Sequence, residues 1–120
     1  MKYLKLGLFI LLFSTCGVKK IPAEVLPINE MKLIMWDMMK MDEYYVRITI
    51  SDTLHKLDQE QFRLYEQVFN AYNITKQKFY KSYDYYQSNP VVFKTLLDSV
   101  EALSSRQKTM GYNKKYAHPK

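Results

Sequence analysis

The stretch Asn73–Val100, NITKQKFYKSYDYYQSNPVVFKTLLDSV, carries the signals that decide the fold. Ile74 and Thr75 stand just before a run of polar and aromatic residues, and Phe79 follows at the fourth helical position. An apolar residue, a capping hydroxyl and a second apolar residue at this spacing are typical of a hydrophobic staple around an N-cap. The pattern predicts that a helix begins after Thr75 and covers about 76–88.

A second helix start follows at once in the same stretch. Asn89 is a good capping residue, and Pro90 stands at the first helical position, where its missing N–H costs nothing. Phe93 occupies the apolar slot of the first turn. These residues predict a helix over about 90–107.

Two more starts of the same kind lie upstream. Each has an apolar residue, a capping residue and an apolar residue at the fourth helical position: Ile28, Asn29 and Leu33 in the first, Leu57, Asp58 and Phe62 in the second. They predict helices over about 30–51 and 59–72, and Asn73 is the expected C-terminal stop of the latter.

Apolar residues recur every three or four positions in all four segments, as expected for one buried face per helix. The expected core residues are Met31, Ile34, Met35, Met38, Met41, Tyr45 and Ile48, then Phe62, Tyr65, Val68, Phe69 and Tyr72, then Phe79, Tyr83 and Tyr86, and finally Phe93, Leu96, Leu97, Val100 and Leu103. Short links at 73–75 and 88–90 imply that neighbouring helices turn back on each other. The sequence therefore predicts an all-α fold, a small bundle of about four helices over residues 28–107.

The first fifteen residues have the features of a secretory leader. Lys2 and Lys5 precede an apolar run at 6–13, and Cys16, the single cysteine, follows Ser14-Thr15. The run is too short to span a bilayer as a mature helix, which takes about 20 residues. The pattern resembles a bacterial lipoprotein signal, which implies lipidation of Cys16 and cleavage before it; an ordinary cleaved signal and an uncleaved anchor are the alternatives. Residues 1–15 are then the signal peptide.

Charge is distributed unevenly along the chain. Residues 1–20 carry four bases and no acids, and residues 106–120 carry five bases and no acids. Residues 21–105 hold nine bases and twelve acids, so the helical domain is mildly acidic although the net charge is +6. We therefore expect no nucleic-acid partner. Residues 16–27, with two prolines, are predicted to be a lipidated tether, and 108–120 a basic flexible tail that is either solvated or in contact with an anionic surface.

Several short motifs along the chain together carry a resemblance to a known family. They are Pro27-Ile28-Asn29-Glu30-Met31 and Ile34-Met35-Trp36-Asp37-Met38 in the first half, and Tyr65-Glu66-Gln67-Val68-Phe69, Tyr72-Asn73-Ile74-Thr75, Tyr85-Tyr86, Asn89-Pro90 and Asp98-Ser99-Val100 in the second. Over about residues 22–105 the chain resembles a family of small lipoproteins of Bacteroidota that is catalogued as a domain of unknown function. The family often has a small-acidic-small stretch after the first-helix Asp, and this chain has Met41-Asp42-Glu43-Tyr44 there. The resemblance implies a helical envelope lipoprotein and brings no activity with it.

Residues able to carry catalysis are sparse. His55 and His118 are the two histidines, and neither has a ligand partner at metal-site spacing, so we expect no metal and no cofactor. No histidine is placed to activate a serine. Asp37 and Asp42 are five positions apart, about 140° around a helix, so they are not expected to act as a pair, and Asp42 and Glu43 are expected to flank a solvated face. We expect that the protein is not an enzyme.

Three residues are candidates for contact with a partner. Asp37 follows Trp36 in an apolar stretch, either as a buried polar anchor or as part of a polar stripe with Lys40. Tyr80 and Tyr85 belong to a tyrosine cluster and form either an exposed patch for protein or glycan, or part of the ordinary surface.

The expected function is that of a non-enzymatic envelope lipoprotein, a protein-binding accessory subunit or adaptor of an outer-membrane or periplasmic assembly. The alternative is a binder of a small apolar or glycan ligand within the helical bundle. A membrane contact through the lipid at Cys16 and an envelope protein partner follow from the first hypothesis. Gly17 and the absence of acids up to Lys20 favour the periplasmic leaflet of the outer membrane.

Overall fold

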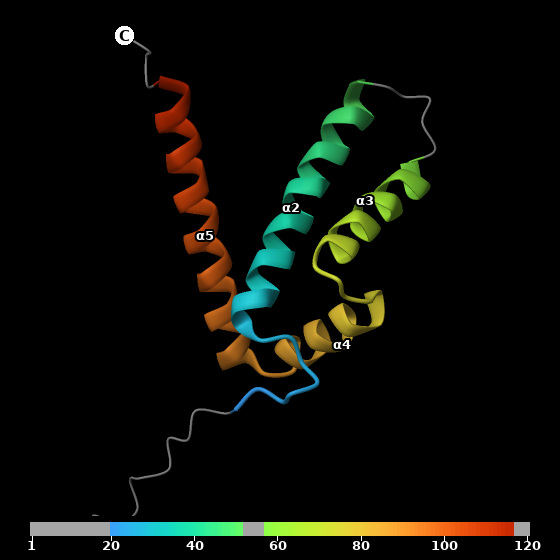
Figure 1. Cartoon of the computed structure of the whole chain (residues 1–120), viewed down its shortest axis with the longest axis vertical. Coiled ribbons are helices and arrows are strands. Elements are labelled where there is room, and N and C mark those ends of the chain that lie inside the picture. The colour runs from blue at the N-terminus through green and yellow to red at the C-terminus, as the bar shows by residue number, and fades with distance from the viewer. Residues whose placement is uncertain (1–19, 52–56, 117–120) are drawn as a thin grey trace, which may run out of the picture.

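The computed structural model describes residues 20–51 and 57–116, with side chains described for 20–50 and 59–111. These residues form a small all-α bundle (Figure 1). Its helices are α2 (Ile28–Ser51), α3 (Leu57–Ala71), α4 (Lys76–Gln87) and α5 (Pro90–Tyr116). The predicted fold class is confirmed, and each predicted helix has its counterpart. The leader, Cys16, His55 and His118 lie outside the described residues.

Helix α2 is the centre of the arrangement. It packs against α3 on one side and α5 on the other, and α4 packs against α5. Figure 1 shows α4 crossing the end of the bundle at which α2 and α5 begin. We call this end, with residues 20–27 and α4, the base. The C-terminal halves of α2 and α5 extend away from the base, so the bundle is closed at one end only.

The turn between α3 and α4 is formed at Asn73, as the sequence predicts. Asn73 has a φ of 51°, the left-handed conformation that asparagine tolerates better than most residues. The N–H of Ile74 donates to the carbonyl of Phe69 at 3.0 Å, and the N–H of Asn73 donates to that of Asn70 at 3.1 Å. These are the two bonds of a Schellman motif. The predicted stop at Asn73 is confirmed.

Two of the predicted helix starts are also confirmed. The Thr75 hydroxyl accepts a hydrogen bond from the N–H of Lys78 at 3.1 Å, and α4 begins at the next residue. Helix α5 begins at Pro90, and the Asn89 carbonyl accepts from the N–H of Phe93 at 2.9 Å. Local capping chemistry therefore determines the ends of α4.

The starts of α2 and α3 lie two residues earlier than the sequence predicts. The Pro27 carbonyl accepts from the N–H groups of Glu30 and Met31, at 3.0 and 2.9 Å, so the helix begins at Ile28. Asn29 is inside the first turn, and its side chain accepts from the Lys32 ammonium at 3.2 Å. The predicted cap at Asn29 is wrong because the preceding proline carbonyl already accepts the first helical bonds. The Asp58 side chain lies outside the described ones.

The hydrophobic core lies near the base and along the faces of α2. Its buried members are Val25, Leu26, Met31, Ile34, Val68, Phe69, Phe79, Tyr86, Leu96 and Val100. Phe62 and Leu97, both expected in the core, are exposed, and Leu64 is buried instead of Phe62. Helix α3 packs chiefly on α2. A helix with one main neighbour buries a narrower stripe than the three-or-four spacing predicts.

The segment before α2 belongs to the folded domain, so the predicted tether over 16–27 is wrong for its last residues. Val25 and Leu26 are buried in the core. The Leu26 N–H donates to the buried Ser82 hydroxyl at 2.9 Å, and the Tyr86 hydroxyl donates to the Leu26 carbonyl at 2.7 Å. Both backbone groups of Leu26 are therefore satisfied by side chains of α4, and the Val25 N–H donates to the Pro22 carbonyl at 3.0 Å, so the segment can stay buried without unpaired groups at these positions.

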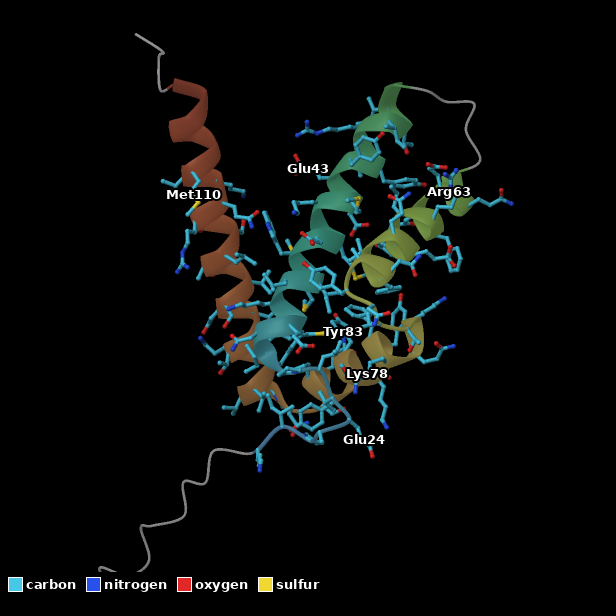
Figure 2. All side chains as sticks on the ribbon, viewed as in Figure 1. Glu24, Glu43, Arg63, Lys78, Tyr83 and Met110 are labelled. Atoms are coloured by element: carbon cyan, nitrogen blue, oxygen red, sulfur yellow. The ribbon has the colours of Figure 1, made fainter. Side chains whose placement is uncertain are left out.

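Glu24 holds the same segment from outside. Its carboxylate pairs with Lys81, and its backbone carbonyl accepts from the Lys78 ammonium at 2.5 Å. The hydrogen bond from Lys81 and the positive charge of that lysine lower the pKa of Glu24. Figure 2 shows Glu24 and Lys78 together at the base, where the segment passes α4.

Helix α5 is longer than predicted, and the flexible tail expected over 108–120 is wrong for residues up to Tyr116. The helix continues through Gly111, at a cost of about 1 kcal/mol relative to alanine. Arg, Gln, Lys and Met, which favour helices, precede this glycine and offset its cost. Residues 117–120 lie outside the described residues.

Replacing Ser82 by alanine is expected to lower the free energy of unfolding by about 1–3 kcal/mol, because the N–H of Leu26 is then buried without a partner. Urea denaturation followed by circular dichroism measures the change. Ser99→Ala is the matched control: both hydroxyls donate to the carbonyl four residues earlier, at 2.8 Å, and Ser82 also accepts from the distant segment. Equal losses in the two variants would contradict this role of Ser82.

Candidate partner-contact site

Asp37 lies on the flank of α2 that faces α3. Its carboxylate accepts a hydrogen bond from the Tyr72 hydroxyl at 2.6 Å, and its other oxygen pairs with the Lys40 ammonium at 2.5 Å. The side chain is half-buried. The carboxylate therefore ties α2 to α3 and also belongs to the polar stripe expected with Lys40. Its role in partner binding stays a prediction.

Asp42 makes a second tie of the same kind. Its carboxylate accepts from the Tyr65 hydroxyl at 2.5 Å and from the Gln61 amide at 3.4 Å. The expectation that Asp42 lies on a solvated face is wrong, because its side chain is half-buried between two helices. Asp37 and Asp42 stand about 140° apart around α2. Both are reached from α3 because the tyrosine side chains are long.

The two pairs have a sequence signal that went unused. Tyr65 and Tyr72 are seven positions apart, so they lie on one face of α3. Asp37 and Asp42 run in the opposite order, as they must in antiparallel helices, because the earlier acid meets the later tyrosine. A search for tyrosines at heptad spacing opposite two acids would find them.

Burial and the acids determine the protonation of these tyrosines. Burial is the largest cause and raises the pKa of both Tyr65 and Tyr72 to about 12, and the hydrogen bond to the neighbouring carboxylate adds to the rise. Each phenol therefore keeps its proton at neutral pH and donates it to the acid. The two pairs act as hydrogen-bonded ties between helices, and proton transfer is not favoured.

Tyr80 and Tyr85 do not form one patch. Tyr80 is exposed, its ring lies 5.3 Å from that of Phe79, and the Lys76 ammonium lies 5.8 Å from its ring. Tyr85 is half-buried, packs on the core, and has its ring 5.7 Å from that of Tyr86. Five positions on a helix separate them by about 140°. Tyr80 is thus open to solvent and Tyr85 packs on the core, and the role of the two residues in partner contact stays a prediction.

The clearest apolar surface lies elsewhere, on α2. Met39, Val46 and Ile50 have spacings of seven and four, so they form one stripe. They are 51%, 53% and 78% exposed. We call these three residues the open α2 face. The sequence analysis missed it because these three residues lie outside the apolar stripe that it expected to form the core side of this helix.

The open α2 face begins after Trp36, the residue through which α2 is hydrogen-bonded to α5. The Trp36 indole N–H donates to the Gln107 side-chain oxygen at 2.6 Å, which joins the two helices. Figure 1 shows them diverging from the base toward their C-terminal ends. In Figure 2, Glu43, which lies between Met39 and Val46 in sequence, points to the α5 side of α2. The divergence leaves this side of α2 in solvent.

Helix α5 is also exposed to solvent beyond Gln107. Met110 is 61% exposed. A Cβ added at Gly111, one turn after Gln107, would meet no atom within 4 Å. Both observations show that α5 is exposed to solvent around Met110 and Gly111.

The described residues, 20–51 and 57–116, have neither a metal-binding cluster nor a membrane-spanning helix. Within these ranges no group of three His, Cys, Asp or Glu side chains could hold a metal ion. None of the described helices is long and apolar enough to cross a membrane.

The fold and the contact surfaces define a small all-α domain whose N-terminal segment is folded into its base. The chain belongs to the family described as Domain of unknown function (DUF4296), whose model matches residues 22–110. The match begins within the segment that α4 holds and ends within the extended part of α5. No curated protein and no solved structure matches the chain.

The Asp37–Tyr72 pair is expected to stabilise the bundle by about 1 kcal/mol, below the range for hydrogen bonds to buried charges because both groups are partly solvated. A double-mutant cycle with Tyr72→Phe and Asp37→Ala, measured by urea denaturation, gives this coupling. Tyr80→Phe, in the exposed ring, is the control and should change the free energy of unfolding by less than about 0.5 kcal/mol. A coupling of zero would show that the two groups stabilise nothing together.

Stability is expected to fall as the pH rises from about 10 to about 12. The folded-state pKa of Tyr65 and Tyr72 is about 12, against an ordinary value of 10.0, so above pH 10 the unfolded chain releases protons that the folded chain keeps. Urea denaturation at a series of pH values measures the slope. The double variant Tyr65→Phe/Tyr72→Phe should have a shallower slope in this window. An unchanged slope in the double variant would contradict the raised pKa of Tyr65 and Tyr72.

Proposed function

We propose that this chain is a lipid-anchored protein of the cell envelope that acts without catalysis, by contact with another protein. In this proposal it is an accessory subunit or adaptor of an outer-membrane or periplasmic assembly. The leader at residues 1–15 and Cys16 after it support the anchor. Gly17 and the lack of nearby acids favour the periplasmic leaflet of the outer membrane.

An anchor at Cys16 would orient the domain. Lys20 is four positions after Cys16, so this link spans at most about 14 Å. The base, which contains residues 20–27 and α4, would therefore stay close to the bilayer. Helix α5 has 27 residues and is about 40 Å long, and its C-terminal end lies opposite the base (Figure 1). The open α2 face would then point away from the lipid.

The open α2 face is the observation that carries the proposal of protein contact. Its three side chains are large, apolar and aligned, and more than half of each is in solvent. Scattered apolar residues are normal on a protein surface, whereas an aligned group marks a contact site. Met39, Val46 and Ile50 fit the second description. Their distance from the base leaves them accessible to an envelope protein.

Pull-down from membranes tests the proposal. The tagged protein, expressed at its native level, is crosslinked, extracted in mild detergent and analysed by mass spectrometry. We expect one stoichiometric envelope partner that is lost in Val46→Glu. Val91→Glu is the control, because Val91 is also an exposed valine, 82% exposed against 53% for Val46, and it lies at the other end of the bundle, on α5.

The lipid anchor has its own control. In Cys16→Ser the protein should leave the membrane fraction, because lipidation requires the thiol. Recovery of the wild-type protein without a partner would contradict the adaptor role. A lipid or glycan that co-purifies in its place would favour the alternative, a ligand bound within the helical bundle.

A further inference from the structure

We propose that the open α2 face binds an acidic amphipathic helix of a partner protein, which lies between α2 and the basic end of α5. The basic end of α5 consists of Arg106 and Lys108, with Lys114 and Lys115 further along the helix. This inference rests on the proposed function, because it names the chemistry of the partner that the adaptor contacts.

The apolar part of the site has helical spacing. Met39, Val46 and Ile50 repeat at seven and four positions along the exposed side of α2. An amphipathic helix recognises such a stripe with its own apolar residues at the same intervals. On α5, Met110 is exposed and Gly111 has open space beside it, so nothing in the described chain occupies this position. The Trp36–Gln107 hydrogen bond limits the site on the side of the base.

Near this site, α5 carries positive charge that no acid on the same helix offsets. Arg106 and Lys108 are exposed and flank Gln107 at about 100° on either side of α5. No acid occurs after Glu101, so nothing within α5 neutralises them.

Three of the four acids of α2 have partners within the domain, and the fourth, Glu30, lies in the first turn of the helix. Glu43 lies 2.5 Å from Arg47, Asp37 pairs with Lys40, and Asp42 accepts from Tyr65. An incoming helix therefore meets apolar side chains on α2 and unneutralised positive charge on α5. Its complement is apolar on one face and acidic on the other.

Two other occupants fit the same surface less well. A second copy of the chain, paired symmetrically through this face, would bring two basic α5 ends together. A membrane would have to lie at the end of the bundle opposite the base, whereas the anchor would hold the base against the bilayer. The charges and the geometry thus favour a separate acidic helix.

Binding of two designed peptides tests the inference. Both are 18-residue amphipathic helices with leucines on one face; the other face carries glutamates in the first and lysines in the second. The full chain, purified from membranes in mild detergent, is titrated into each labelled peptide and followed by fluorescence anisotropy, with detergent as the blank. We expect the glutamate peptide to bind about tenfold more tightly, with a preference that weakens as salt is added.

Variants of the protein locate the binding. Val46→Glu should weaken binding of the glutamate peptide by about tenfold, whereas Val91→Glu should leave it within about twofold. The double variant Arg106→Glu/Lys108→Glu should reverse the preference toward the lysine peptide. All the substituted side chains are exposed, so the substitutions are expected to leave the fold intact. Circular dichroism checks that each variant is folded.

Three results would overturn the inference: equal binding of the two peptides, binding that Val46→Glu does not weaken, or a dimer in sedimentation equilibrium that Val46→Glu dissociates. Its failure can be told apart from failure of the proposed function. An envelope partner that is retained by Val46→Glu and by the charge-reversed variant refutes this site and leaves the adaptor role standing. Selective peptide binding without any partner in the pull-down refutes the adaptor role and supports the site.

Discussion

The architecture depends on the two buried hydrogen bonds of Leu26. Its N–H donates to Ser82 and its carbonyl accepts from Tyr86, so the backbone of one residue is held by two successive turns of α4. Pro27 follows directly and its carbonyl accepts the first bonds of α2. The start of the central helix is therefore positioned on α4, and α4 in turn packs on α5.

The helices were predictable because their signals are local. Thr75, Asn73 and Pro90 act on backbone groups within a few positions, so the sequence around them is enough to determine where α3 ends and where α4 and α5 begin. The segment ending in Leu26 was mistaken for a tether because its partners lie 56 and 60 positions away. Prolines and the lipidation expected at Cys16 favour a linker, and no local pattern reveals a partner that distant.

The contact surfaces were harder to predict for a different reason. The Asp–Tyr ties and the open α2 face depend on how α2 sits between α3 and α5. Periodicity indicates which residues share a face, and it does not say whether a neighbour covers that face. Met39, Val46 and Ile50 would be core residues if α5 ran parallel to α2 over its whole length. They are exposed because the two helices diverge (Figure 1).

The short distance between Cys16 and the buried Leu26 also bears on how a partner is captured. Many anchored domains hang on long flexible linkers, which enlarge the volume searched and dilute the effective concentration of the binding site. With the lipid on Cys16, this domain would stand at a nearly constant height and tilt above the bilayer. Little rotational freedom is then left to lose on binding. The distance of the open α2 face from the bilayer would then be fixed by the length of a rigid helix. The face would bind only partners whose own contact segment lies at that distance from the membrane.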